Sequence, residues 1–313
     1  MHIPDGFLDA KTVAATAALA AAGVSMAVYR ARRTVPPAKV PLLGLSAAFL
    51  FAAQMVNFPV AGGTSGHLIG SVLAAIMLGP SGAVIALSAV LTVQALLFGD
   101  GGLLALGANI LNMAVLAPLV GFALYRLVSR MIGGPRGRLT AAGFAAWCSI
   151  VVAAAVCAGE LAWSGAVPWS VGLAAMTGIH ALIGVGEAVV TMLVIAAVGR
   201  IRPDLVGSSA PVPSSRVSFL VYAALVTSVV AIFIAPFASR WPDGLEKVAS
   251  TLGFSARALP HPLIASPLAD YRIPWIESPG LAAGLAGGVG ALVVLALSFV
   301  LATALVPRAQ NGR

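Results

Sequence analysis

The chain has 313 residues, of which 60% are hydrophobic and 9% are charged, and its mean hydropathy is +1.01. This composition excludes an ordinary globular enzyme and indicates an integral membrane protein. The formal net charge of +8 does not indicate a nucleic-acid partner, because the lysines and arginines lie in short loops or at the chain ends, where they set membrane topology.

The N terminus places a histidine directly after the start methionine. The α-amine of Met1, the main-chain nitrogen of His2 and the His2 imidazole can together chelate one divalent ion if the amide loses its proton. Ni(II) and Cu(II) favour such square-planar nitrogen fields. No secretory signal precedes this motif, and the bulky second residue disfavours removal of Met1, so we expect the N terminus to stay as written. These three nitrogens fill three corners of the square, so the fourth corner needs a donor from elsewhere in the chain.

Nine apolar segments are candidates for membrane-spanning helices, which need roughly 20 residues each. They cover residues 11–29, 41–56, 67–79, 82–98, 103–126, 139–163, 169–198, 217–236 and 279–306. The third is short. We therefore predict an all-α membrane protein, a polytopic helical bundle of about nine transmembrane helices arranged as seven plus two.

The basic residues sort to one side of the membrane when the loops between these segments alternate. Of the 18 lysines and arginines, thirteen fall on that side: Arg30, Arg32, Arg33, Lys39, Arg126, Arg130, Arg136, Arg138, Arg200, Arg202, Arg216, Arg308 and Arg313. Positive loops stay in the cytoplasm. We therefore predict a multi-pass protein of a bacterial inner membrane, with an extracytoplasmic N terminus and a cytoplasmic C terminus.

The loop between the second and third segments lies on the same side as His2 and ends in His67, a candidate fourth nitrogen donor. Around it, Asn57, Thr64 and Ser65 offer hydrogen bonds that can orient the imidazole. Asp100, between glycines on the same side, can attract cations or hold the N-terminal segment. From these residues alone, a loop-capping His67 and a solvated His2 remain open alternatives.

Other polar residues lie inside the apolar segments. His180 and Glu187 are seven residues apart on one helix face, so they are too far apart along the axis, at about 10 Å, to hold one ion together. Ionisable residues at membrane depth are functional candidates by default, and hydrogen bonding between helices is the structural alternative. We expect the latter role for Gln54, Gln94, Asn109 and Asn112, and a solvated loop position for His261.

A polar, proline-containing linker at residues 200–216 divides the chain into a seven-span domain, residues 1–199, and a two-span domain, residues 217–313. We place the linker in the cytoplasm. The second domain contains an extracytoplasmic loop at 237–278 with several prolines. We expect a small ordered domain there, with one short helix near residues 244–252, and no enzyme core.

Four motifs of the first domain stand out: Met1 to Gly6, Gly63 to Leu68, Gly99 to Gly102 followed by Asn109 and Asn112, and Gly186 to Ala188. Together they resemble the cobalt and nickel substrate-capture components of energy-coupling factor transporters. The resemblance covers roughly residues 1–200. It implies a bundle into which the N-terminal segment folds, with Ni(II) or Co(II) held by Met1, His2 and His67 as transported substrate.

The remainder resembles the small two-span partner subunit of the same family, through the Pro-Asp-Gly-Leu-Glu signature at Pro242 to Glu246. The resemblance implies a fusion of the two proteins, in which residues 217–313 assist metal loading. It also implies partners: a transmembrane coupling subunit and cytoplasmic ATPase subunits.

No phosphate-binding loop ending in Gly-Lys-Ser or Gly-Lys-Thr occurs in the sequence. We therefore expect a transporter component without its own ATPase site, with no organic cofactor and with contact to membrane lipid. Three rival functions stay open: capture of a vitamin, which the 7% aromatic content disfavours, a membrane metal sensor, and an intramembrane hydrolase that uses His180 and Glu187. The choice between nickel and cobalt also stays open.

Overall fold

The computed structural model describes residues 1–207, 212, 215–260 and 263–305. Its α-helices are α1 (Ala10–Thr34), α2 (Val40–Gln54), α3 (Ser71–Leu78), α4 (Pro80–Val93), α5 (Leu106–Asn109), α6 (Ala117–Ile132), α7 (Gly134–Trp163), α8 (Trp169–Ile201), α9 (Arg216–Val229), α10 (Gly244–Leu252) and α11 (Pro279–Leu305). Two short strands, β1 (Phe58–Val60) and β2 (Thr64–Gly66), pair antiparallel, with Pro59 opposite Ser65. The all-α class is confirmed.

Every predicted apolar segment coincides with a helix. Seven helical stretches of the described chain are long and apolar enough to cross a membrane, and three of them contain π-helical turns. These stretches are Ala10–Thr34, Pro80–Phe98, Leu106–Ile132, Gly134–Trp163, Trp169–Ile201, Arg216–Phe237 and Pro279–Leu305. Of the other two predicted spans, α2 is a shorter apolar helix, and α3, the predicted short third span, has eight residues.

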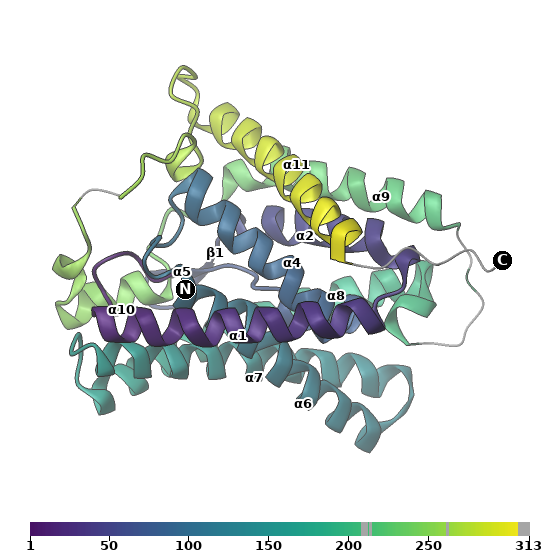
Figure 1. Cartoon of the computed structure of the whole chain (residues 1–313), viewed down its shortest axis with the longest axis horizontal. Helices are drawn as coiled ribbons and strands as arrows, with labels where there is room; N and C mark the ends of the chain where they lie inside the picture. Colours follow the sequence, from purple (N-terminus) through teal and green to yellow (C-terminus); the bar gives the residue numbers. More distant parts are fainter. Residues whose placement is uncertain (208–211, 213–214, 261–262, 306–313) are drawn as a thin grey trace.

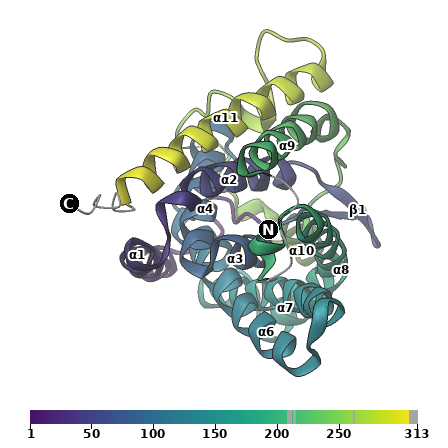
Figure 2. The ribbon, with the colours of Figure 1, turned by 90° about the vertical axis from the view of Figure 1, so that its right-hand side faces the viewer.

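The helices run roughly along the long axis of the molecule (Figure 1). Viewed end on, α6, α7 and α8 form one group, α2, α9 and α11 form another, and α3 and α4 lie between them (Figure 2). The two long helices of the second domain pack beside α2, so the domains share one bundle. The chain segments around residues 30–40, 126–138 and 200–207 gather at one end together with the start of α9, and we call this end the basic end.

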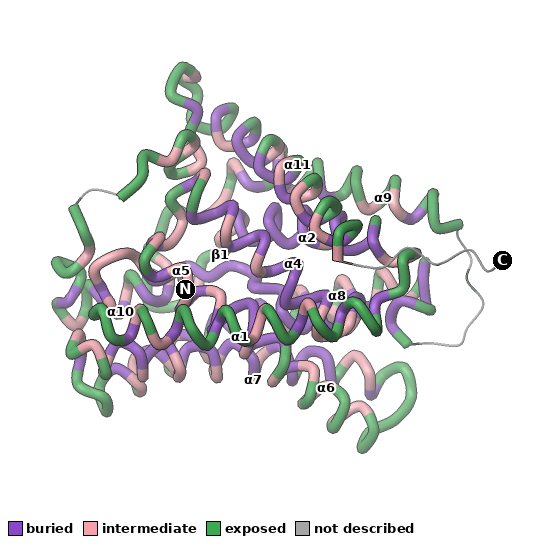
Figure 3. The backbone as a smooth tube through the Cα atoms, in the orientation of Figure 1, coloured by how far each residue is buried: buried purple, intermediate pink, exposed green. Residues whose placement is uncertain are grey.

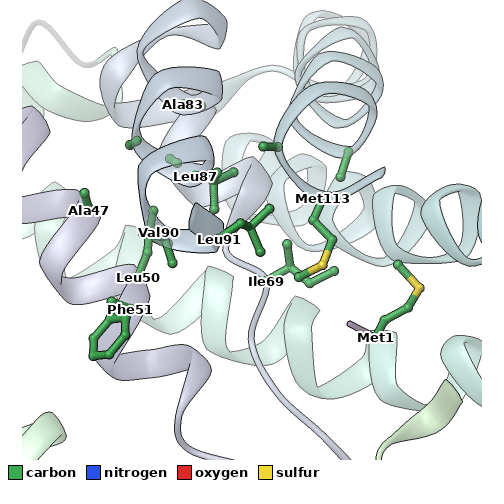
Figure 4. Packing of buried hydrophobic residues seen from close by; sticks show 14 of the residues in the cluster. Met1, Ala47, Leu50, Phe51, Ile69, Ala83, Leu87, Val90, Leu91 and Met113 are labelled. Atoms are coloured by element: carbon green, nitrogen blue, oxygen red, sulfur yellow. The ribbon is translucent and has the colours of Figure 1, made fainter. Parts of the chain in front are cut away.

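Burial follows the expectation for a protein in lipid (Figure 3). The middle of the bundle is buried, while outer helix faces expose large apolar side chains such as Leu182, Val189 and Leu193 of α8. Exposed apolar faces are stable where the solvent is hydrocarbon. The central cluster is built from alanine, leucine and valine side chains of α2, α3 and α4, and it includes Met1, which Figure 4 shows near Ile69 and Met113.

The short helix α3 begins inside the bundle, where its free amide groups need partners. Glu187 of α8 supplies them: its two carboxylate oxygens accept hydrogen bonds from Ile69 N at 2.7 Å and Gly70 N at 2.8 Å. Gly70 is required at this turn because its φ is +72° and a β-carbon there would collide with Leu50. Glu187 therefore supports the loop that carries His67.

The second domain reaches back over the opposite end from the basic end. The helix predicted near residues 244–252 is α10, and it begins with a capping box in which Asp243 and Glu246 each accept an amide hydrogen bond. Gly244 lets α10 approach α8 closely, because a β-carbon at Gly244 would lie 2.8 Å from a ring carbon of His180. Part of the predicted linker is also ordered, as a turn of 3-10 helix at Pro203–Val206.

Candidate metal centre

The first residues of the chain enter the bundle instead of lying in solvent. Ile3 is fully buried, and its main chain is held on both sides: its N–H donates to Asn109 Oδ1 at 2.8 Å, and its carbonyl accepts from Asn109 Nδ2 and Gly102 N. Asp5 accepts hydrogen bonds from three amides just before α5, those of Leu103, Leu104 and Ala105. Together these contacts fix the position of the chain end.

The Met1 amine and the His67 ring meet at the centre of this end of the bundle. Met1 N lies 3.1 Å from His67 Nε2. The other ring nitrogen, Nδ1, lies 3.3 Å from the Leu68 carbonyl. A carbonyl accepts only, so Nδ1 carries the proton and Nε2 keeps the lone pair that a metal needs.

The His2 ring stacks on the His67 ring, with 5.2 Å between the ring centroids and 21° between the planes. His2 Nδ1 lies 3.1 Å from Asp100 Oδ1, and His2 Nε2 lies 3.3 Å from Gln94 Oε1. Burial lowers the pKa of His2, against the opposing effect of the Asp100 charge, so the ring is neutral at neutral pH. The predicted ligands Met1, His2 and His67 thus lie together, with Asp100 beside them.

One neighbour of the chain end belongs to the second domain and was not predicted. Asp243 Oδ2 accepts from the Met1 ammonium at 2.7 Å, in a largely buried ion pair. Although burial opposes the charged form, the ammonium and its hydrogen bond lower the pKa of Asp243 well below its usual value. The Pro-Asp-Gly-Leu-Glu signature pointed to this segment but not to its contact with Met1.

Tyr271, also from the second domain, approaches the other side of the centre. Its hydroxyl donates to Asp100 Oδ2 at 2.6 Å, while the opposite oxygen of Asp100 faces His2. Asp270 and Tyr271 both have positive φ, at 53° and 56°, a strained conformation for residues other than glycine. The second domain therefore contacts the N-terminal amine directly, through Asp243. It acts on the His2 ring indirectly, because Tyr271 bonds the Asp100 carboxylate that faces His2.

The predicted supporting residues Thr64 and Ser65 serve mainly to join the domains. Ser65 N and Thr64 Oγ1 donate to the Pro242 carbonyl at 2.8 and 3.0 Å, and Ser65 Oγ donates to the Trp241 carbonyl at 2.7 Å. Asn57 accepts from Ser239 N through its main-chain carbonyl. These contacts place the residue after Pro242, which is Asp243, against Met1.

The remaining polar candidates divide between the centre and the helix bundle. Gln94 and Asn109 hold His2 and Ile3, as described above. Gln54 donates to the Ile69 carbonyl in the loop before α3, and Asn112 donates to Glu160 of α7. His180 donates from Nδ1 to the Met176 carbonyl at 2.8 Å, and its Nε2 has no partner among the described residues. The His180 ring lines a small cavity with Met1, His67 and Asp243. His261 lies outside the described residues.

The arrangement offers nitrogen donors of two kinds, main chain and imidazole. A cluster of three or more His, Cys, Asp or Glu side chains suited to one ion is not found in the described part of the chain. The donors that meet here are the Met1 amine and the His67 ring, with the His2 ring stacked beside them. Such donors suit late first-row ions, and Asp100 and Asp243 add negative charge around them.

Replacing Asp243 with asparagine should expose the Met1 amine. A broken buried ion pair costs about 3 kcal/mol, more than the roughly 1.4 kcal/mol that changes an equilibrium tenfold. We expect the acetylation rate of the α-amine by an amine-reactive ester, followed by mass spectrometry of the N-terminal peptide, to rise at least about tenfold.

The matched control for this variant is Asp270→Asn, in the same domain. Asp270 is exposed in a loop near the centre. It is a suitable control because the amine pairs with Asp243 instead. The control should react at the rate of the unaltered chain. Equal rates for Asp243→Asn and the unaltered chain would contradict the ion pair.

Two family models match the chain. Residues 2–205 match CbiM, described as the cobalt uptake substrate-specific transmembrane region, and residues 217–307 match the PDGLE domain. A protein of Archaeoglobus fulgidus named as a fused nickel transport protein NikMN is 36% identical, over 96% of this chain and 98% of its own length.

Of two further relatives, one is named for nickel and the other for cobalt. The fused nickel transport protein NikMN of Rhodobacter capsulatus is 39% identical over 66% of this chain and 63% of its own length. Cobalt transport protein CbiM 2 of Pelobacter propionicus is 36% identical over 41% and 57% of the two chains. A crystal structure described as a truncated transition metal transporter superposes with a TM-score of 0.59 at 35% identity, covering 64% of this chain and 99% of that one.

Proposed function

The chain belongs to the CbiM family of metal-uptake membrane proteins and carries a fused PDGLE domain, and on that premise we propose that it captures Ni(II) or Co(II) for ATP-driven import. The observation that supports the proposal most is the 3.1 Å approach of the Met1 amine to His67 Nε2, with the His2 ring stacked on His67. In this proposal, Met1 supplies its amine, His2 its amide and imidazole nitrogens, and His67 its Nε2.

The ion is transported substrate, and binding it requires small local changes. The Met1 ammonium must release its proton and its contact with Asp243, and the His2 ring must exchange one of its present contacts for the ion. Asp100 and Asp243 stay beside the centre and offset the charge of a divalent ion. The second domain thereby assists loading without supplying a nitrogen ligand.

The energy for import comes from partners, since the sequence contains no phosphate-binding loop. We assign this role to cytoplasmic ATPase subunits that act through a transmembrane coupling subunit. The excess of lysine and arginine at the basic end supports a cytoplasmic location for that end. The N terminus and the metal centre then face the extracytoplasmic side, from which the ion is taken up.

Uptake of radioactive Ni(II) by cells that produce the chain tests this function. We expect uptake only when the coupling and ATPase subunits are produced with it, and we expect excess Co(II) to compete. Binding of Ni(II) to the purified chain without any partner-dependent uptake would favour a metal sensor instead. A separate measurement of the metal content of the purified chain distinguishes nickel from cobalt.

The affinity for Ni(II) should rise steeply with pH. Burial lowers the pKa of His2, and His67 Nε2 already carries a lone pair, so neither ring gives up a proton near neutral pH. Chelation instead releases one proton from the ammonium and one from the His2 amide. Below neutrality we expect the apparent affinity to rise roughly a hundredfold per pH unit, measured by titration calorimetry in buffers of different pH.

The slope distinguishes this chelate from a centre made of imidazoles alone. Two neutral rings release no proton on binding, so such a centre would give an affinity almost independent of pH in the same range. A flat profile would therefore argue against participation of the chain end.

A further inference from the structure

Two adjoining cavities lie at the basic end of the bundle, remote from the metal centre. The larger, of about 220 Å³, is bordered by apolar side chains of α2, α3, α8 and α9. The smaller, of about 130 Å³, lies between the segments around residues 36–42, 202–205 and 216–220. Leu42 and Phe219 line both cavities, so the two cavities are adjacent.

The larger cavity has the character of a hydrocarbon site. Its inner wall includes Leu50 and Phe219, which are 1% and 6% exposed, and its rim includes Tyr222 and Val226, which are more than half exposed. An exposed rim on a membrane-facing helix makes the cavity accessible from the bilayer. Such a surface suits the acyl chain of a lipid, because an acyl chain has no polar groups that lose hydration on binding.

The smaller cavity, by contrast, carries positive charge. Its charged lining residues are three bases, Lys39, Arg202 and Arg216, and one carboxylate, Asp204. The net charge of the lining is therefore +2. Arg202 is committed to Asp204, with contacts of 2.8 and 2.6 Å. Hydrogen bonds from Arg202, together with the charge of Arg216, lower the pKa of Asp204, which places Arg216 within electrostatic reach of this carboxylate.

Lys39 and Arg216 retain donors for a ligand. Lys39 Nζ donates to the Met77 carbonyl at 3.3 Å, which uses one of its three protons. Arg216 is exposed at the start of α9. Basic pockets between transmembrane helices, next to apolar grooves, are typical sites for acidic lipid headgroups.

We propose that the two cavities together bind one anionic phospholipid, with its phosphate at Lys39 and Arg216 and an acyl chain between α2, α3, α8 and α9. The charge of the smaller cavity selects a negative headgroup, and the apolar cavity next to it selects a molecule that also has an acyl chain. A free phosphate would leave the apolar cavity unused, and an apolar helix of a partner would leave the excess positive charge unmatched. The lipid bridges the first domain, through α2 and Lys39, and the second domain, through α9 and Arg216.

Native mass spectrometry of the full purified chain, with added phosphatidylglycerol or phosphatidylcholine, tests this site. We expect one phosphatidylglycerol to stay bound to each chain, more tightly than phosphatidylcholine. The double variant Lys39→Gln/Arg216→Gln should weaken phosphatidylglycerol binding roughly thirtyfold, because each basic residue near an acidic lipid contributes about 1 kcal/mol. Binding of phosphatidylcholine should not change.

Two further variants separate the headgroup from the acyl chain. Arg130→Gln/Arg136→Gln removes two exposed charges at the same end that line neither cavity, and it should bind phosphatidylglycerol like the unaltered chain. Ala197→Phe, at an exposed position that lines the larger cavity, should weaken binding of both lipids. Ni(II) binding, at the other end of the bundle, reports whether each variant is folded. Arg216→Gln alone repeats the test at an exposed position, and its affinity for phosphatidylglycerol should fall about fivefold.

Several outcomes would overturn the proposal. Equal retention of the two lipids by the unaltered chain would remove the headgroup selectivity, and undiminished phosphatidylglycerol binding by the folded double variant would remove the assigned residues. Full displacement by excess inorganic phosphate would identify a phosphate site without a lipid. Displacement of the lipid by the purified coupling subunit, with cross-links from Ala197 to that subunit, would identify the groove as a protein interface.

Discussion

A chain extended by a few residues ahead of Met1 should lose Ni(II) binding by at least about a thousandfold. Extension converts the basic amine into an amide, so the fused chelate rings cannot form. Four-donor metal sites contribute about 10–16 kcal/mol, so each donor accounts for roughly two to three powers of ten in affinity. The structure adds a steric reason, because Met1 is only 5% exposed and leaves little room for preceding residues.

Equilibrium dialysis with Ni(II) and the purified chain measures this loss. The matched control carries the same extension after residue 313, at the opposite end of the chain, and should bind like the unaltered protein. A retained formyl group on Met1 should act like the N-terminal extension, with a minimal change in size. Unchanged affinity of both N-terminally blocked forms would remove the chain end from the metal centre.

The second large effect concerns the fourth nitrogen. His67→Ala should weaken Ni(II) binding by about a hundredfold to a thousandfold, because it removes one of the four donors that we propose. The loop should keep its shape, since Glu187 still holds the amides of Ile69 and Gly70 and Ser65 still bonds the segment before Asp243. Titration calorimetry gives the affinity, and the thermal transition of the same sample shows whether the variant is folded.

His180→Ala is the control for this variant, because His180 lines the same small cavity but directs its Nδ1 to the Met176 carbonyl. We expect its Ni(II) affinity to stay within about threefold of the original, a change smaller than 1 kcal/mol. Equal losses in the two variants would indicate general disturbance of the cavity instead of loss of a ligand. Intact Ni(II) binding with failed uptake would give His180 a role of its own, as the rival function based on His180 and Glu187 requires.

The helices were predictable because lipid imposes a simple rule on sequence. Long apolar segments with few charges, such as residues 169–198, have few alternatives to the helix in a membrane. The short helix α3 was harder to interpret, because its start depends on the carboxylate of Glu187, more than 100 residues further along the chain. The separation of 117 residues between Gly70 and Glu187 leaves no local pattern from which to infer this contact.

The centre was predictable in part, for a related reason. His2 and His67 stand out because histidine is rare in this chain, with four in total. Asp243 and Tyr271 could not be assigned, because their contacts with Met1 and Asp100 arise from the way the second domain folds back over the first. Thr64 and Ser65 were expected to orient His67, and their hydrogen bonds to the main chain of Trp241 and Pro242 depend on the same docking.

The Asp243 carboxylate performs two tasks at once. One oxygen caps the first turn of α10 by accepting from Glu246 N, and the other accepts from the Met1 ammonium. Any event that shifts α10 therefore changes the free energy of the contact between the amine and Asp243, and so the free energy of ligand binding at the amine. By thermodynamic reciprocity, a ligand on the amine changes the stability of α10 by the same amount. A change in backbone amide exchange along α10 on adding Ni(II) would report occupancy of the proposed centre, to which we assign no ligand from this helix.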